Sequence, residues 1–545
     1  MALAARASTW QPLARPTFRA LWIAQFASNS GTWTQLVGAQ WLMGDLGGGP
    51  FQVALVQAAT TGPVCLLALP AGALGDMLDR RRLLLSSQSL MLVGAAALAV
   101  LTAAGALTQG LLLGLIAVMG VGQALSIPSF QAVQPELVPR EEIPQAALLN
   151  GANVNVARAV GPAIGGFLIA TIGPQGTFAL NAASFLAVLV VLYAWERAPD
   201  HRPLGTEHIT AAIRAGARYV GSAPRYATVL VRQGIFILFA SALWALLPAV
   251  ALGPLDLGAA GYGALLAGVG VGAVAGAFLV PMLRERGGGN VLVGSATLVF
   301  AGVMLLLAYV PSAVVALVAL VVAGLAWIAV QATLNATMQI LLPDWTRARA
   351  LAYANLVFQG GQTLGAVVWG AVAGAWTLHS GLAVPAAGMV VCGLLAMRAL
   401  PLPPTTPDVR PARHWPEPNL VTDPAGNAGP VLVTVEYRVD PADAAAFAEA
   451  MRPVGQVRRR TGASLWGLFQ DAGDPAVFLE TFTVGTWHEH LRQHLERGTI
   501  MDRETEARAY AYVASEPRVR HLLWAYAPGA LEASPTVVPS DEPLV

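Results

Sequence analysis

Over its first 400 residues the chain alternates long apolar segments with short polar ones. Windows of about 20 residues, the length that crosses a bilayer as a helix, predict twelve spans. The first six lie at 18–44, 51–75, 83–106, 109–134, 145–172 and 176–196. The second six lie at 227–253, 260–283, 291–310, 312–341, 348–376 and 380–400. The pattern predicts an all-α polytopic membrane region.

Arginines divide the loops between these spans into two kinds. They precede span one and follow every even-numbered span, whereas the alternate loops carry none. By the positive-inside rule, both termini should face the cytoplasm. We therefore expect a multi-pass protein of the cytoplasmic (inner) membrane, embedded in the lipid bilayer, with residues 1–17 as a cytoplasmic N-terminus.

The two groups of six spans repeat one another. A shift of 204 residues places like residues together: Gly72 on Gly276, Arg80 on Arg284, Gly161 on Gly365 and Gly166 on Gly370. Such an offset indicates two parallel six-helix halves, 18–196 and 227–400. They are joined by a cytoplasmic linker at 197–226, in which residues 211–220 should form a short amphipathic helix.

The loop between spans two and three is strongly charged. It reads G-A-L-G-D-M-L-D-R-R-R, so its bend must lie in water or among headgroups. An ordinary positive loop would look similar. Our hypothesis is a gating motif of five residues, Gly72, Asp76, Arg80, Arg81 and Arg82. In it, Asp76 would meet Arg80 or a helix N-terminus only while the inner gate is closed.

Span five is the most polar of the predicted helices. Arg158 lies past its middle, where a cation costs several kcal/mol unless it faces water or a partner. We interpret Arg158 as lining a substrate cavity that attracts an anionic or carbonyl-rich solute; a structural arginine bonded to helix ends is the alternative. The other predicted cavity residues are Asn150, Asn153, Asn155, Asn29, Gln35, Gln123, Asn335 and Gln362. No carboxylate lies clearly at mid-membrane, so the sequence identifies no proton carrier.

Residues 401–429 form a proline-rich linker to a soluble part, 430–527, and 528–545 should be a disordered tail. Strand and helix patterns in the soluble part follow the order βαββαβ, which predicts a ferredoxin-like α+β domain. His490 and His494 lie four residues apart, as zinc ligands can on a helix. Because no third ligand stands at a recognisable spacing, we predict no metal site. We interpret the two histidines as part of a solvated or dimer-contact face.

Composition excludes several classes of protein. With 55% hydrophobic and 12% charged residues, the chain is too apolar for a soluble globule. A net charge of +1, dispersed in short loops, gives no reason to expect a nucleic-acid partner. The two cysteines are isolated in apolar segments, and no phosphate-binding loop, catalytic set or cofactor motif is visible.

The charged loop resembles the loop between helices two and three of the major facilitator superfamily, although Met77 and Asp79 depart from its pattern. Span five carries the G-P-x-x-G-G signature of its antiporter-type exporters at Gly161, Pro162, Gly165 and Gly166. A packing face without an exchange role is the alternative for that signature. The membrane region resembles bacterial siderophore exporters, and the soluble part resembles the antibiotic-biosynthesis monooxygenase group.

These resemblances imply a secondary active transporter, not an enzyme. It would export a small organic solute, drug-like or siderophore-like, by alternating access. Export could be coupled to protons, and the chain could self-associate through the C-terminal domain. Two alternatives stay open. The C-terminal domain could act as an enzyme or ligand sensor that the membrane region anchors, or the transporter could be an importer.

Overall fold

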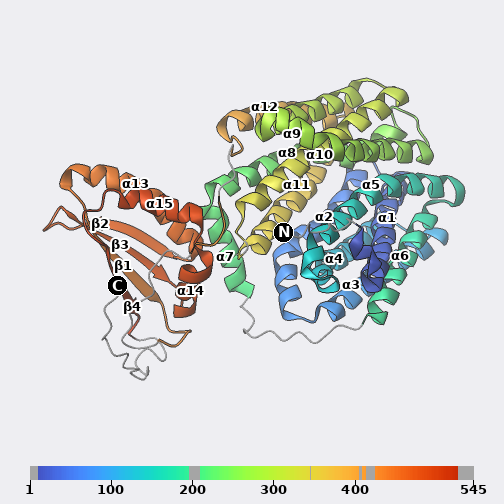
Figure 1. Cartoon of the computed structure of the whole chain (residues 1–545). Helices are drawn as coiled ribbons and strands as arrows, with labels where there is room; N and C mark the ends of the chain where they lie inside the picture. The colour runs from blue at the N-terminus through green and yellow to red at the C-terminus, as the bar shows by residue number, and fades with distance from the viewer. Residues whose placement is uncertain (1–9, 196–208, 344, 404–407, 413–423, 526–545) are drawn as a thin grey trace, which may run out of the picture. The chain divides into compact units, whose positions relative to one another are not determined.

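The computed structural model describes residues 10–195, 209–343, 345–403, 408–412 and 424–525 (Figure 1). Two compact units make up the chain. The first holds α1–α6 and most of α8–α12, and the second holds α7, residues 210–227 and 337–351, and the C-terminal domain. The predicted N-terminus up to residue 9, residues 197–208, 404–407 and 413–423 of the two linkers, and the tail from 526 lie outside the described residues.

Six helices form the first half of the membrane region, and five form the second. The first six are α1 (Pro16–Asp45), α2 (Pro50–Met77), α3 (Arg80–Ala103), α4 (Gln109–Val133), α5 (Ile143–Ile172) and α6 (Pro174–Ala194). The others are α8 (Pro224–Leu252), α9 (Ala259–Tyr309), α10 (Ala313–Leu341), α11 (Arg347–Ala375) and α12 (Leu378–Ala399). The short helix predicted at 211–220 is α7, Ile209–Ser222.

Ten helices of the described chain are long and apolar enough to cross a membrane, against twelve predicted spans. One difference arises at α9, whose 51 residues contain both the eighth and the ninth predicted span. Gly288 interrupts it with φ 73° and ψ 159°, a backbone that glycine adopts without strain. The other difference is that α1 is not among the ten helices, because its many polar side chains lower its mean hydropathy.

Equivalent contacts in the two halves bear out the repeat. A Cβ on Gly161 would meet the backbone of α1 at Ser30, and a Cβ on Gly365 would meet the backbone of α8 at Leu238. In the same way Gly120 packs on α2, and Gly324 packs on α9. Close backbone approach through small residues is how helices associate in lipid. Glycines related by the 204-residue offset therefore make equivalent helix–helix contacts in the two halves.

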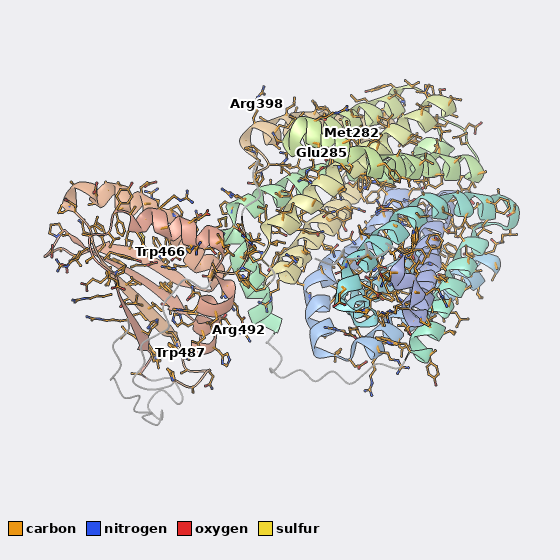
Figure 2. All side chains as sticks on the ribbon, viewed as in Figure 1. Met282, Glu285, Arg398, Trp466, Trp487 and Arg492 are labelled. Carbon is orange, nitrogen blue, oxygen red and sulfur yellow. The ribbon has the colours of Figure 1, made fainter. Side chains whose placement is uncertain are left out.

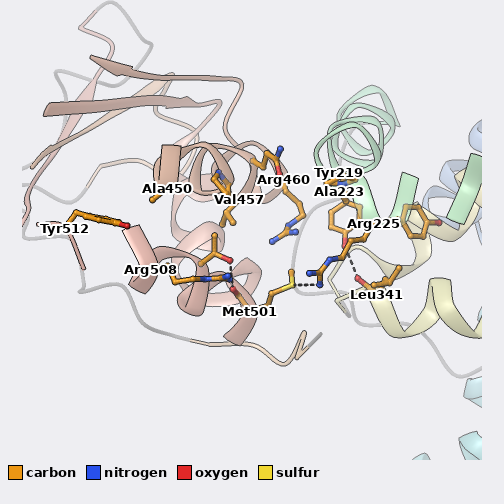
Figure 3. A pocket seen from close by; sticks show the side chains of 15 residues that line it. Tyr219, Ala223, Arg225, Leu341, Ala450, Val457, Arg460, Met501, Arg508 and Tyr512 are labelled. Carbon is orange, nitrogen blue, oxygen red and sulfur yellow. Dashed lines mark hydrogen bonds between the residues drawn. The ribbon is translucent and has the colours of Figure 1, made fainter. Parts of the chain in front are cut away.

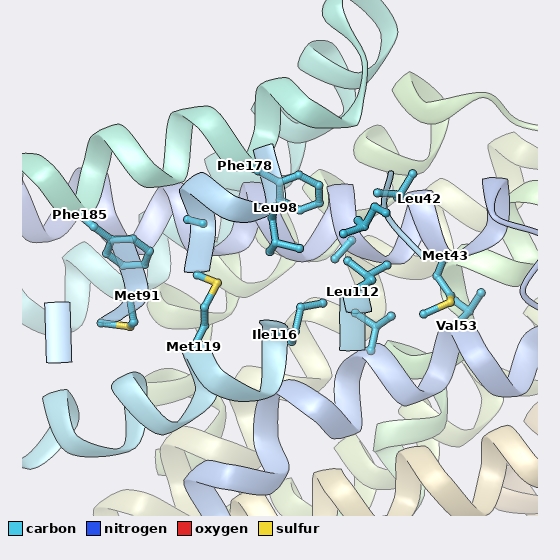
Figure 4. Close-up of a cluster of buried hydrophobic side chains, with 14 residues drawn as sticks. Leu42, Met43, Val53, Met91, Leu98, Leu112, Ile116, Met119, Phe178 and Phe185 are labelled. Carbon is cyan, nitrogen blue, oxygen red and sulfur yellow. The ribbon is translucent and has the colours of Figure 1, made fainter. Parts of the chain in front are cut away.

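Methionine, leucine and phenylalanine side chains fill the centre of the first half (Figure 4). The cluster joins α1, α2, α3, α4 and α6. Its largest members include Met43, Leu98, Leu112 and Phe178, each fully buried. Because lipid is as apolar as these side chains, the cluster stabilises the half through close packing rather than through removal from water.

The C-terminal domain is a four-stranded antiparallel sheet covered by helices on one face (Figure 1). Its elements are β1 (Val431–Arg438), α13 (Ala444–Thr461), β2 (Leu465–Gln470), β3 (Val477–Val484), α14 (Trp487–Arg492), the π-helical η5 (Gln493–Arg497), α15 (Ile500–Tyr510) and β4 (Arg518–Leu523). The strand order is β2-β3-β1-β4. The predicted βαββαβ order and ferredoxin-like fold are confirmed.

A buried ion-pair network lies under this sheet. Arg458 on α13 contacts Glu480 at 3.0 Å and Glu506 at 2.6 Å. Glu480 also accepts hydrogen bonds from the hydroxyl of Tyr437 and the indole of Trp466. Buried charges persist only when they are paired in this way. Figure 2 labels Trp466 and, at the start of α14, Trp487.

Candidate functional site: a polar cavity between the two halves

A cavity of about 440 Å³ lies between the two halves, within the first unit. Amide side chains dominate its first-half walls, and its second-half walls are largely aromatic. The polar and aromatic lining residues include Gln25, Asn29, Trp33, Gln35, Gln57, Gln88, Gln123, Gln131, Gln134, Asn150, Asn153, Arg158, Asn181, Trp244, Trp327, Phe358, Gln359 and Gln362. Its size and mixed lining suit a small organic molecule.

Seven of the nine cavity residues predicted from the sequence line this cavity: Arg158, Asn150, Asn153, Asn29, Gln35, Gln123 and Gln362. Asn155 and Asn335 do not. At about 100° per residue, Asn155 lies on one side of Arg158, whereas Asn150 and Asn153 lie on the other. The Asn155 amide instead donates to the carbonyl of Gly151 on its own helix. Asn335 is exposed on α10.

Arg158 supplies the cavity's positive charge. Its guanidinium carbon lies 5.3 Å from the centre of the Trp33 ring, within range of a cation–π interaction. The Arg158 Nε is buried and makes no hydrogen bond. No carboxylate of the described residues forms an ion pair with Arg158, and no carboxylate lines the cavity. Arg158 therefore has hydrogen-bonding capacity and charge available for a ligand.

The neighbouring amides, by contrast, are tied to one another. Asn29 donates to Asn153 at 2.9 Å, and Asn153 donates to the carbonyl of Trp22 at 2.9 Å. Asn181 donates to Gln35 at 2.7 Å. In membrane helices each such bond contributes about 0.6 kcal/mol. These bonds hold α1 against α5 and α6 and fix the wall in which Arg158 stands.

The aromatic wall was not predicted. Trp33, Trp244, Trp327 and Phe358 form a chain of ring contacts with centroid distances of 6.0, 5.3 and 6.3 Å. Tryptophans far from the ends of α8 and α10 were the available signal, because tryptophan in spans usually lies at the interface. The cavity thus joins one cation and many amides to an apolar wall of aromatic rings.

The two halves are closed against each other at the helix ends that lack arginine. Tyr262 near the start of α9 donates to Gln40 near the end of α1 at 2.6 Å. Gly166 on α5 approaches Gly263 on α9 so closely that a Cβ on Gly166 would lie 2.9 Å from the Gly263 Cα. Gln25, Gln134 and Asn150 extend the cavity toward the arginine-bearing ends.

The G-P-x-x-G-G signature lies in two interfaces. Gly161 and Gly165 pack on α1, where Thr34 donates to the carbonyl of Gly161 at 2.8 Å. Gly166 packs on α9 of the other half. Pro162 is buried between them. The signature therefore connects the cavity-bearing helix both to its own half and to the closed end.

The charged loop is anchored within the first half. Arg80 pairs with Glu136 beyond α4, and Arg81 donates to the carbonyls of Leu192 and Tyr193 at the end of α6. Asp79 accepts from the backbone of Arg82 at 2.8 Å, which caps α3. This cap explains the departure of Asp79 from the superfamily pattern. Gly72 and Asp76 fall in the last turns of α2, and their side chains lie outside the described residues.

A second cavity, of about 570 Å³, lies within the second unit (Figure 3). Its lining includes Tyr219, Arg225, Arg460, Met501 and Arg508. The Tyr219 hydroxyl donates to the carbonyl of Leu341 at 3.2 Å. Burial raises the pKa of Tyr219 to about 12, an effect that the charge of Arg460 opposes. No sequence pattern predicts this cavity, because its walls come from segments far apart in the chain.

Two parallel helical halves around a central polar cavity, closed at one end, define a secondary transporter of the major facilitator type. Solved structures share the fold. A POT family transporter in complex with a thioalcohol-conjugated peptide has a TM-score of 0.59 at 13% identity, covering 69% of this chain and 94% of that one. A bacterial homologue of the human lysosomal transporter Spinster has a TM-score of 0.55 at 16% identity, covering 70% and 97%.

The chain belongs to the transmembrane secretion effector family, whose sequence profile matches residues 7–528. It is similar to the multidrug efflux pump Tap of Mycolicibacterium fortuitum, with 26% identity over 69% of this chain and 93% of the relative. It is also similar to the enterobactin exporter EntS of Shigella boydii serotype 18, with 27% identity over 71% and 92%. The predicted superfamily is confirmed, and the protein is a membrane transporter rather than an enzyme.

Proposed function

We propose that the protein exports a small organic solute from the cytoplasm by alternating access, and that Arg158 and its surrounding amides bind that solute. The observation that carries the proposal is the Arg158 guanidinium, which stands in the cavity between the halves with no carboxylate beside it. Its fixed charge favours an anionic or carbonyl-rich group. The aromatic wall of Trp244 and Trp327 favours a flat apolar body attached to that group.

The direction of transport is inferred from the packing of the halves. The cavity extends toward the arginine-bearing ends, which the positive-inside rule assigns to the cytoplasm of the inner membrane. The opposite ends are closed by contacts such as that between Tyr262 and Gln40. This arrangement would load solute from the cytoplasm. Efflux by the relatives Tap and EntS supports the same direction.

Energy would come from an ion gradient, with proton antiport as the form that the G-P-x-x-G-G signature favours. A coupled proton needs a titrating group on its path. Because the cavity lining contains no carboxylate, the proton would bind outside the cavity or on the solute itself. Solute transport that depends on an imposed pH gradient would distinguish either form of proton coupling from uniport.

Flux in inverted membrane vesicles tests the proposal. Vesicles from a strain that lacks its own exporters should accumulate an aromatic carboxylate or a catecholate siderophore when they contain this protein, and a protonophore should abolish accumulation. Protease added outside the vesicles should cleave the C-terminal domain, which reports the orientation. Accumulation only in right-side-out vesicles would show an importer, and no flux for any solute of either class would contradict the proposal.

Truncation after residue 420 tests the alternative in which the C-terminal domain acts and the membrane region is an anchor. We expect the truncated chain to export within about twofold of the full chain, because the residues that line the cavity between the halves end at Gln362. It should also lose any self-association, since the open face of the sheet exposes Leu465 and Phe469. Loss of export from a stably inserted truncated chain would favour the alternative.

A further inference from the structure

Three histidines meet in the C-terminal domain, between its helices and its sheet. His490 lies on α14, His494 on η5 and His521 on β4. One ring nitrogen of each lies within 4.8 Å of the others. The ring centroid of His490 lies 4.6 Å from that of His494 and 4.8 Å from that of His521. The third member was missed in the sequence because it stands on a strand remote from the helical pair.

The innermost histidine makes no hydrogen bond of normal geometry. His490 is 0% exposed, and only the side chain of Gln493 lies within polar reach of its ring. The Nε2 of His521 is also buried without a partner. Buried polar groups without a well-formed hydrogen bond are unfavourable and rare in folded proteins, so these call for an explanation. A bound cation would supply one, because a ring nitrogen without a hydrogen carries a lone pair.

Imidazole binds metals through the lone pair of its neutral form. A cation held by these rings would not be opposed by the neighbouring arginine. The nearby charge of Arg458 is balanced by its ion pairs with Glu480 and Glu506.

The backbone around the cluster is specialised. His494 lies in a five-residue π-helical segment, Gln493–Arg497, which interrupts the α-helical phase after His490. Such segments are rare and occur often at functional sites. On the sheet side, His521 pairs in register with Val433, whose side chain is buried beneath the helices. The imidazoles of the helical segments and of the strand therefore lie close together, and the Trp487 ring contacts those of His490 and His521.

We propose that His490, His494 and His521 form a binding site for a late first-row divalent metal ion, Zn²⁺ foremost. Three imidazoles suit zinc, copper, nickel and cobalt, and Zn–N distances of about 2.1 Å place the ligand nitrogens about 3.4 Å apart. Closing the present spacing to that value requires rotation of His494 and His521, which are only partly buried. The fourth position stays open on their side. The ion would tie strand β4 to α14 and η5.

Cobalt binding to the full chain tests the site. The protein is purified in detergent through a tag that contains no histidine, stripped with a chelator and titrated with Co²⁺. We expect the visible absorption of a four-coordinate ion at one equivalent per chain, displaced by Zn²⁺. His494→Gln and His521→Gln should each weaken binding by more than about a hundredfold, beyond the usual loss from an outer-shell change.

His488→Gln is the matched control, because His488 stands on the same helix but is exposed and outside the cluster. It should bind as the wild type does. Near-ultraviolet circular dichroism must show that each variant keeps its fold, and Zn²⁺ should raise the melting temperature of the wild type but not of His521→Gln. If a folded His494→Gln or His521→Gln chain binds Co²⁺ like the control, the three rings are only a packing cluster.

Discussion

Replacing Arg158 with alanine should lower solute flux by at least about thirtyfold while the chain still inserts and folds. The reason is that Arg158 offers the only positive charge among the residues that line the cavity, and no carboxylate in the described part of the chain pairs with it. Losing a hydrogen bond to a charged group costs about 2 kcal/mol, which corresponds to that factor. Flux in inverted vesicles, normalised to the amount of inserted protein, measures the effect.

Asn155→Ala provides the matched control for this variant. Asn155 lies three residues from Arg158 on the same helix, but it bonds to the carbonyl of Gly151 and does not line the cavity. Flux should stay within about twofold of the wild type. Arg158→Lys, which keeps the charge but loses the planar fork, should fall between the two. Wild-type flux in Arg158→Ala would show that the arginine is structural and that the solute binds elsewhere.

The energetic cost of charge in a membrane is what made Arg158 predictable. A sequence shows directly that a cation lies far from either end of an apolar span. Because a charge is unfavourable in hydrocarbon, such a cation must face a partner or a water-filled cavity. The amides were harder, because a hydrogen bond between helices and a solute contact require the same residues. Asn155 was wrongly assigned to the cavity wall, because spacing along a helix does not show which face of the helix lies against the cavity.

Other parts of the molecule depend on contacts that no local pattern reveals. The order of strands and helices along the C-terminal domain followed from strand alternation and helix-start signals, and the structure confirms it. The aromatic wall and the third histidine did not, because Trp327 and His521 meet their partners only after distant segments pack together. The break predicted between the eighth and ninth spans corresponds to the kink at Gly288, where the backbone of α9 leaves the helical conformation.

Replacing Gly166 with valine should hold the transporter open at the ends that lack arginine and reduce flux to background. A Cβ at this position would lie 2.8 Å from the carbonyl oxygen of Ala259 and 2.9 Å from the Cα of Gly263. Both are backbone atoms of the other half, so no side chain can move aside. Overpacking of this kind costs about 1–3 kcal/mol, enough to shift the balance between two states by about 5- to 150-fold.

Accessibility of a cysteine in the cavity measures that shift. Ala39→Cys places a thiol in the cavity wall, 1% exposed, in a chain in which Cys65 and Cys392 are replaced by serine. With Gly166→Val, a membrane-impermeant thiol reagent added to right-side-out vesicles should label this cysteine at least about fivefold faster. Gly151→Val is the control on the same helix, because no atom lies within 4 Å of its added Cβ. Unchanged labelling together with normal flux in Gly166→Val would mean that α5 and α9 do not form the outer closure, and the alternating-access assignment of this contact would fail.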